Sequence, residues 1–216
     1  MEKIFNNTQN AFELKSNGEL DRAYFLFKMI ANPGLVKVGT KVTNLALRFN
    51  LPVEGIIRKT IFDQFCGGVS ETDCLKVVDL MYTKGVSSVL DYSVEGKAEE
   101  TQFDATLEMT LRTIDFAKER KAIPYAVFKP TGVGRIELYE KVGLKQNLSD
   151  LETAEWKRTV ARFEKICKTA FEKDVMLLID AEESWMQDAA DDLCEEMMRQ
   201  YNKQKAIIYN TAQFYR

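Results

Sequence analysis

The stretch that decides the fold is Val175-Met176-Leu177-Leu178-Ile179-Asp180-Ala181-Glu182-Glu183, in which a block of apolar side chains leads directly into three carboxylates. A short apolar run that ends in polar residues is typical of a buried strand. A charge at the end of such a strand costs free energy unless it is paired or used in chemistry. The stretch therefore predicts a strand over about 175–180 with functional residues at its carboxyl end.

Three further apolar runs end in polar or charged residues, namely Val89-Leu90-Asp91-Tyr92-Ser93-Val94-Glu95, Tyr125-Ala126-Val127-Phe128-Lys129 and Ala206-Ile207-Ile208-Tyr209-Asn210-Thr211-Ala212-Gln213. Amphipathic helical stretches separate the runs, for example over about 98–119. Alternating strands and helices predict an α/β fold with a parallel sheet and right-handed crossovers. Polar residues at the strand ends are the layout of a β/α barrel, whose active site lies at those ends.

The predicted strands lie at about 87–94, 124–129, 175–180 and 206–212. A TIM-like (βα)8 barrel needs eight strands, so we expect residues 85–216 to form its first four β/α units, incomplete in this chain. Residues 1–84 are predicted to be an N-terminal helical region. Ser149 with Glu152, and Ser184 with Gln187, match the capping box and predict two helix starts.

Composition excludes several classes of function. The 216 residues carry a formal net charge of −3, which does not suggest a broad nucleic-acid footprint. The chain has no histidine, which excludes a Ser-His-Asp triad and histidine metal ligands within it. Its four cysteines form no CxxC pair, so we expect free thiols and no metal site. No run of about 20 apolar residues predicts a membrane-spanning helix, and the N-terminus lacks the apolar segment of a secretion signal.

Lys129 and Asp180 are the leading candidates for chemistry, because each ends one of two consecutive predicted strands. A buried Asp180 needs a cation, and Lys129 can supply it while it orients a substrate. Two other interpretations of Lys129 stay open: a lysine that snorkels to solvent, or one that forms a Schiff base as in barrel aldolases. Glu95 and Asp91 end the first strand, and either could be a further partner of Lys129.

Asn210 and Gln213 follow the last strand. Their amides can donate and accept hydrogen bonds, which suits the edge of a flavin or nicotinamide ring, although they could equally satisfy nearby backbone. Thr131-Gly132-Val133-Gly134-Arg135 lacks the full spacing of a phosphate-binding loop and is interpreted as a flexible turn.

Together these residues resemble the proline dehydrogenase family. The resemblance rests on four segments in the family's order: Leu90-Asp91-Tyr92-Ser93-Val94-Glu95-Gly96-Lys97, Val127-Phe128-Lys129-Pro130-Thr131-Gly132, Ile179-Asp180-Ala181-Glu182-Glu183-Ser184-Trp185-Met186-Gln187 and Tyr209-Asn210-Thr211-Ala212-Gln213-Phe214-Tyr215. The last has Ala212 where the family has tyrosine. The resemblance implies a distorted β/α barrel with FAD, which oxidises L-proline to Δ1-pyrroline-5-carboxylate and passes the electrons to a membrane quinone.

The resemblance also implies roles for single residues. Lys129 would lie against the substrate carboxylate and the flavin, with Asp180 and Glu95 as carboxylates beside the site. Asn210 or Gln213 would be the amide that touches the flavin, and Ala181 would join the cofactor-binding residues. A cytoplasmic protein, peripheral at the inner face of the membrane, is the expected location.

The family's fifth strand brings an arginine, a lysine and a glycine-rich run to FAD, and its last helix brings paired arginines to the proline carboxylate. This chain ends before both, so we expect a truncated chain that is weak or inactive alone. Two alternatives remain. One is a non-catalytic half-barrel that associates with another chain, or with itself, through open barrel edges. The other is an imine-forming barrel lyase that uses Lys129.

Overall fold

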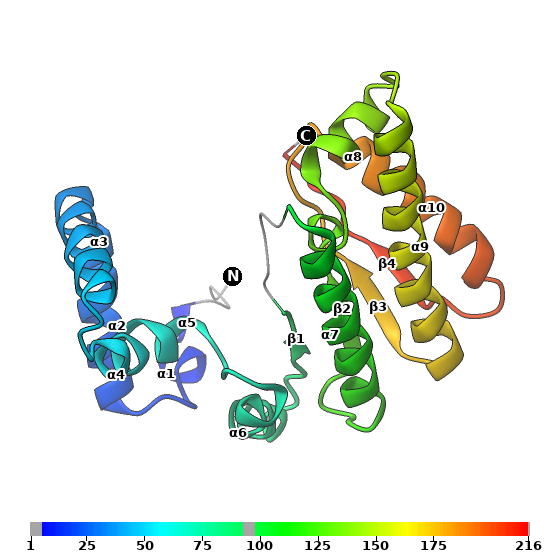
Figure 1. The fold of residues 1–216 in the computed structure, drawn as a ribbon. Helices are drawn as coiled ribbons and strands as arrows, with labels where there is room; N and C mark the ends of the chain where they lie inside the picture. The colour runs from blue at the N-terminus through cyan, green and yellow to red at the C-terminus, as the bar shows by residue number, and fades with distance from the viewer. Residues whose placement is uncertain (1–5, 93–97, 216) are drawn as a thin grey trace. The chain divides into compact units, whose positions relative to one another are not determined.

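The computed structural model describes residues 6–92 and 98–215 (Figure 1). The chain divides into two compact units, Met1–Met81 and Tyr82–Arg216. The first unit is helical, and several of its helices begin at capping residues. Ser16 and Glu19 form a complete capping box at the start of α2, and Asn32 caps α3 directly before Pro33. The elements are α1 (Thr8–Ala11), α2 (Asn17–Ile30), α3 (Pro33–Arg48), α4 (Glu54–Ile57), a π-helical turn (Arg58–Phe62), α5 (Asp63–Phe65) and α6 (Glu71–Tyr82), whose last residue already belongs to the second unit.

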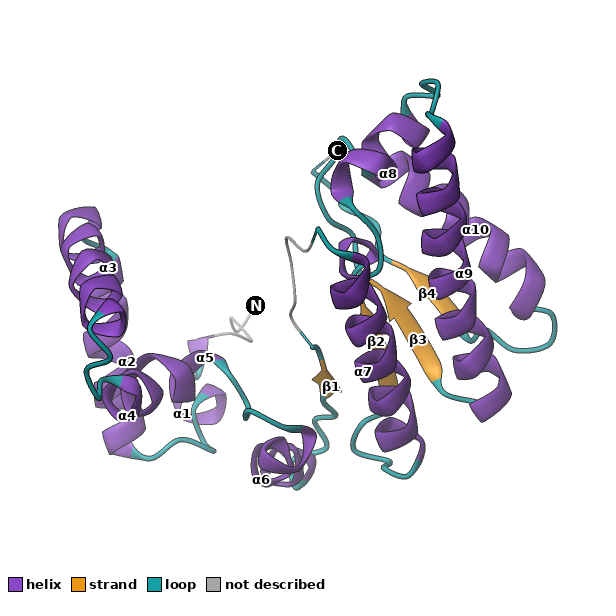
Figure 2. Ribbon diagram, viewed as in Figure 1, coloured by secondary structure: helices purple, strands orange, loops and turns teal. Residues whose placement is uncertain are grey.

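The second unit alternates strands and helices, as Figure 2 shows. Its elements are β1 (Val89–Leu90), α7 (Glu100–Lys118), β2 (Tyr125–Phe128), a 3-10 turn (Pro130–Gly132), α8 (Ile136–Gly143), α9 (Asp150–Lys173), β3 (Met176–Ile179), α10 (Gln187–Tyr201) and β4 (Ile208–Asn210). The strands form one sheet in the order β1-β2-β3-β4, and every neighbouring pair is parallel. The predicted α/β fold with a parallel sheet is therefore confirmed.

The two faces of this sheet differ in burial. Helix α9 packs against both α7 and α10, and each of the three helices packs against strands of the sheet. The side chains that point toward them are almost fully buried, namely Ala126, Phe128, Leu177, Ile179 and Ile208. Alternate residues point to the other face and are only half-buried, namely Tyr125, Val127, Met176, Leu178 and Tyr209. By the same alternation, Lys129 and Asp180 lie on this less covered face, just past the ends of β2 and β3.

The two predicted capping boxes have different outcomes. At Ser149 both hydrogen bonds of the box to Glu152 are present, and α9 begins where the sequence predicts. At Ser184 the prediction is wrong, because α10 begins at Gln187 and its first turn has no side-chain cap. Trp185, which lies between Ser184 and Gln187, is 57% exposed. The physical reason is that the Gln187 side chain binds the Glu182 N–H and Asp191 instead of a cap position.

Candidate active site

The centre of the site is an ion pair between Lys129 and Asp180. Lys129 Nζ donates to Asp180 Oδ2 over 2.6 Å, with the side chains 16% and 36% exposed. Burial acts to lower the pKa of Lys129, but the hydrogen bond and the charge of Asp180 outweigh it, so this pKa is raised above its usual value. The lysine is therefore held as an ammonium ion at neutral pH.

Neighbouring strands place the pair. Phe128 of β2 lies opposite Ile179 of β3, and the Asp180 N–H donates to the Phe128 carbonyl over 3.1 Å. The parallel ladder thus continues up to the ion pair and fixes the backbone on both sides of it. The charge of Asp91, which follows β1, also raises the pKa of Lys129. Glu95, the other candidate from the first strand, lies outside the described residues.

A second carboxylate contact lies two residues further along both segments. Glu182 accepts one hydrogen bond from the Thr131 N–H, over 2.8 Å, and one from the Thr131 hydroxyl, over 2.6 Å. Burial raises the pKa of Glu182, and the two Thr131 bonds and the charge of Lys129 oppose that rise. The strand-end pattern of the sequence did not predict this contact. Its signal was the spacing, since the pairs 129/180 and 131/182 both lie 51 residues apart.

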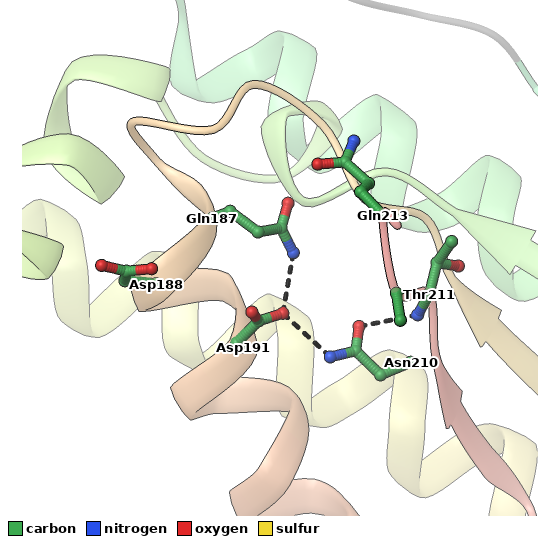
Figure 3. Close-up of a pocket in the computed structure, with 7 residues that line it drawn as sticks. Gln187, Asp188, Asp191, Asn210, Thr211 and Gln213 are labelled. Carbon is green, nitrogen blue, oxygen red and sulfur yellow. Dashed lines mark hydrogen bonds between the residues drawn. The ribbon is translucent and has the colours of Figure 1, made fainter. Parts of the chain in front are cut away.

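The loop after β4 forms a pocket of about 380 Å³ against the first turns of α10. Figure 3 shows a chain of hydrogen bonds along it, in which Asp191 Oδ1 accepts from Gln187 Nε2 and from Asn210 Nδ2, each over 2.8 Å. The Thr211 N–H donates to Asn210 Oδ1 over 2.9 Å. Both ends of the Asn210 amide are therefore used within the protein.

Gln213 is held differently. Its Nε2 donates to the Glu182 carbonyl over 2.9 Å, while its Oε1 is buried and has no hydrogen-bond partner within the described part of the chain. A buried acceptor without a partner is unfavourable and indicates a missing donor. The N–H edge of a flavin ring is such a donor, so Gln213 fits the cofactor that the resemblance implies. Ala181, the other predicted cofactor contact, is half-exposed between Asp180 and Glu182.

Two other classes of site find no support within residues 6–92 and 98–215. No group of three or more cysteine, aspartate or glutamate side chains there is arranged to hold a metal ion. No helix in those ranges combines the length and the hydropathy that a bilayer crossing needs.

Comparisons with known proteins point to the same family as the sequence resemblance. The sequence profile of the family described as "Proline dehydrogenase" matches residues 74–216. The carbapenem antibiotics biosynthesis protein CarD of Pectobacterium carotovorum is 34% identical over 151 residues, which cover 70% of this chain and 40% of that protein. Proline dehydrogenase 1 of Dictyostelium discoideum is 26% identical and aligns with 99% of this chain and 44% of its own length.

A relative of a different name is the hydroxyproline dehydrogenase of Xenopus laevis, 24% identical over 94% of this chain and 51% of its own length. The chain thus spans about half the length, or less, of these relatives. Among solved structures, proline utilization A of Bdellovibrio bacteriovorus, inactivated by N-propargylglycine, shares the fold with a TM-score of 0.51 at 14% identity, over 67% of this chain and 16% of that protein. The profile match covers well over half of the sequence, and the chain belongs to the proline dehydrogenase family.

Proposed function

We propose that this chain carries the substrate-orienting half of an FAD-dependent proline dehydrogenase. The reaction would oxidise L-proline to Δ1-pyrroline-5-carboxylate, with a membrane quinone as the final electron acceptor and a cytoplasmic location at the inner face of the membrane. The observation that carries the proposal is the Lys129–Asp180 ion pair at the carboxyl ends of adjacent parallel strands. Barrel enzymes use this edge for chemistry.

Each member of the pair has a role in this reaction. The Lys129 ammonium would attract the carboxylate of proline and fix the position of its ring. Asp180 would keep Lys129 charged and aimed, since its side chain accepts a 2.6 Å hydrogen bond from it. Glu95 would add a further carboxylate beside the substrate. The described residues directly after the strands (91–92, 129–131, 180–183 and 211–213) hold a single cation, Lys129. We therefore expect weak substrate retention and low activity of the isolated chain.

FAD, when bound, supplies the acceptor for the hydride that leaves the proline ring carbon next to nitrogen. The proline nitrogen would first lose a proton to water, so that its lone pair could form the carbon–nitrogen double bond as the C–H bond breaks. Of the two candidate amides, Gln213 is the better cofactor contact because its Oε1 is unsatisfied, whereas Asn210 is engaged at both ends. Ala181 would line the same cofactor edge.

The test is to add FAD to the purified chain and then L-proline. We expect quenching of flavin fluorescence on binding, followed by slow loss of flavin absorbance when L-proline is present. Hydroxyproline should be compared in parallel, because one relative is named for that substrate. A chain that leaves FAD fluorescence unchanged, and that oxidises neither amino acid, would contradict the proposal.

Two alternatives are separable from this function. An imine-forming lyase needs a neutral lysine, and the raised pKa of Lys129 disfavours it. Borohydride trapping with a carbonyl substrate would reveal an adduct on Lys129 if that alternative holds. A non-catalytic half-barrel that associates with another chain is favoured by the half-buried apolar side chains Tyr125, Val127, Met176, Leu178 and Tyr209 on one face of the sheet.

A further inference from the structure

Glu182 uses each of its polar groups to bind a different segment at the strand ends. Its carboxylate accepts both hydrogen bonds from Thr131, after β2. Its backbone N–H donates to Gln187 Oε1, at the first residue of α10, over 2.9 Å. Its carbonyl accepts from Gln213 Nε2, after β4. One residue thus connects the segments that follow three of the four strands.

A carboxylate is an expensive group for this position if it only holds a loop. Burial raises the pKa of Glu182, which means that its charged form is disfavoured there, and a neutral side chain would avoid this cost. The charge does act on the ion pair, since Glu182 contributes to the raised pKa of Lys129. The other titratable groups that face Glu182 are Glu183 on its own segment and the buried Tyr139 of α8.

We propose that Glu182 is a positioning residue for the reaction, which locks the turn after Lys129 onto the segment after Asp180 and so fixes the ion pair and Gln213 relative to each other. The catalytic part of this inference rests on the proposed function. The lock itself is a property of the chain without cofactor. Thr131 follows Lys129 by two residues in a buried 3-10 turn, so a Thr131 that is released from Glu182 frees the backbone that carries the lysine.

The test compares Glu182→Gln with Glu183→Gln in the purified full chain. Glutamine keeps the size of Glu182 but presents only one oxygen to the two donors of Thr131. Glu183 is the matched control, because it is the adjacent carboxylate, is exposed and makes no side-chain hydrogen bond or ion pair within the described residues. By NMR without FAD, Glu182→Gln should speed hydrogen exchange of the Thr131 amide about tenfold or more and lower the pKa of Lys129, whereas Glu183→Gln should change neither.

Kinetics supply the second measurement. If the wild-type chain oxidises proline, Glu182→Gln should raise KM for proline and lower kcat/KM by about tenfold. Unchanged protection of Thr131 would overturn the lock, and faster exchange with an unchanged KM would overturn the positioning role. If the wild-type chain binds neither FAD nor proline, the proposed function fails, while the NMR result still decides the lock.

A second pair of variants covers the case in which Glu182→Gln does not fold. Thr131→Val removes the hydroxyl donor and keeps the backbone N–H donor, while Thr131→Ser keeps both. We expect Thr131→Val to reproduce part of the rise in KM and part of the change in the Lys129 pKa, and Thr131→Ser to retain the wild-type values. Equal behaviour of the two variants would count against the proposal.

Discussion

At the scale of single residues, the ion pair makes a prediction about Lys129. Asp180→Asn should lower the pKa of Lys129, because the burial that lowers it remains while the charge that raises it is gone. The ε-ammonium titration followed by NMR measures this directly. Glu108→Gln, at an exposed position of α7, is the control and should leave the titration unchanged. A Lys129 pKa that is equal in Asp180→Asn and wild type would refute the pairing.

The same pair has a consequence for stability. The pKa of Lys129 is raised on folding, so the contribution of the pair is fully present below the ordinary lysine pKa of 10.5. It is lost as pH rises through the folded value. The stability difference between wild type and Asp180→Asn in urea should therefore be constant near neutral pH and shrink above about pH 10.5. A difference that grows with pH in this range would show that the sign is wrong.

Sequence alone predicted some of these residues and not others, for physical reasons. Lys129 and Asp180 could be paired because parallel strands bring their carboxyl ends to one edge. Glu182 and Thr131 share the 51-residue spacing of the ion pair, but the spacing alone does not show that the turn after β2 brings the Thr131 N–H and hydroxyl to the Glu182 carboxylate. Asn210 and Gln213 carry the same amide chemistry, so only the hydrogen bonds around them distinguish a satisfied group from an unsatisfied one.

At the scale of elements, the start of α9 depends on Ser149. Its hydroxyl accepts from the Glu152 N–H, and Glu152 binds Ser149 in return. Ser149→Ala should lower the free energy of unfolding by about 1 kcal/mol, the usual contribution of an N-cap side chain. Ser149→Thr keeps an acceptor oxygen, so it should lower the free energy of unfolding by clearly less than Ser149→Ala does. Urea denaturation of the three proteins measures the difference, and equal midpoints for alanine and threonine would contradict the capping role.

The contact of α7 with α9 depends on Arg162, whose side chain is only 6% exposed. It donates from Nε to Asp104 over 2.7 Å and also binds Glu100, the first residue of α7. Arg162→Met leaves both carboxylates without this partner and should reduce stability by roughly 2 kcal/mol at neutral pH. Arg199→Met is the control, because Arg199 forms an exposed ion pair within α10. Its replacement should lower the free energy of unfolding by at most about 0.5 kcal/mol.

The Arg162 contact also predicts a dependence on pH. Hydrogen bonding to Arg158 is the largest cause that lowers the pKa of Glu100 to about 2, and Arg162 adds to it against the effect of burial. A depressed carboxylate pKa contributes stability above the unfolded value near 4.5, which is lost as pH falls through the folded value. The difference in the free energy of unfolding between wild type and Arg162→Met should thus decline as the pH falls from about 4.5 to 2. Acid denaturation followed by circular dichroism checks this, and a difference independent of pH would contradict it.

Helices α7 and α10 show which features of a helix the hydrophobic periodicity predicts and which it does not. The range predicted for α7 was right, but part of its buried face is formed by Thr106, Thr110 and Thr113. Each of these hydroxyls bonds a carbonyl one turn back, which lets a polar residue enter the core. A hydrophobicity pattern does not include such hydrogen bonds, so it does not predict that these threonines are buried. The start of α10 was misplaced for a related reason, since the Gln187 side chain accepts from the Glu182 N–H instead of capping a helix that starts at Ser184.

At the scale of the whole molecule, the order of strands and helices was predictable because alternation restricts the sheet to a parallel arrangement. The exposure of the two faces of the sheet was harder to predict from the sequence. A run such as Met176-Leu177-Leu178-Ile179 reads as uniformly buried, yet in the structure only Leu177 and Ile179 are almost fully covered, on the side of the helices. Apolar sequence does not tell which of the two faces is covered.

This asymmetry predicts that the isolated chain self-associates. β1 is an edge strand within the described sheet, and its Val89 is 41% exposed beside a half-buried apolar face. Val89→Lys should weaken association, because a charged side chain on an edge strand disfavours pairing with another chain. Leu144→Lys adds the same charge at a 59% exposed position at the end of α8 and is the matched control.

Light scattering over a range of concentrations should show a lower mean mass for Val89→Lys alone. A wild type that is monomeric at every concentration, or equal masses for the two variants, would show that this edge does not drive association.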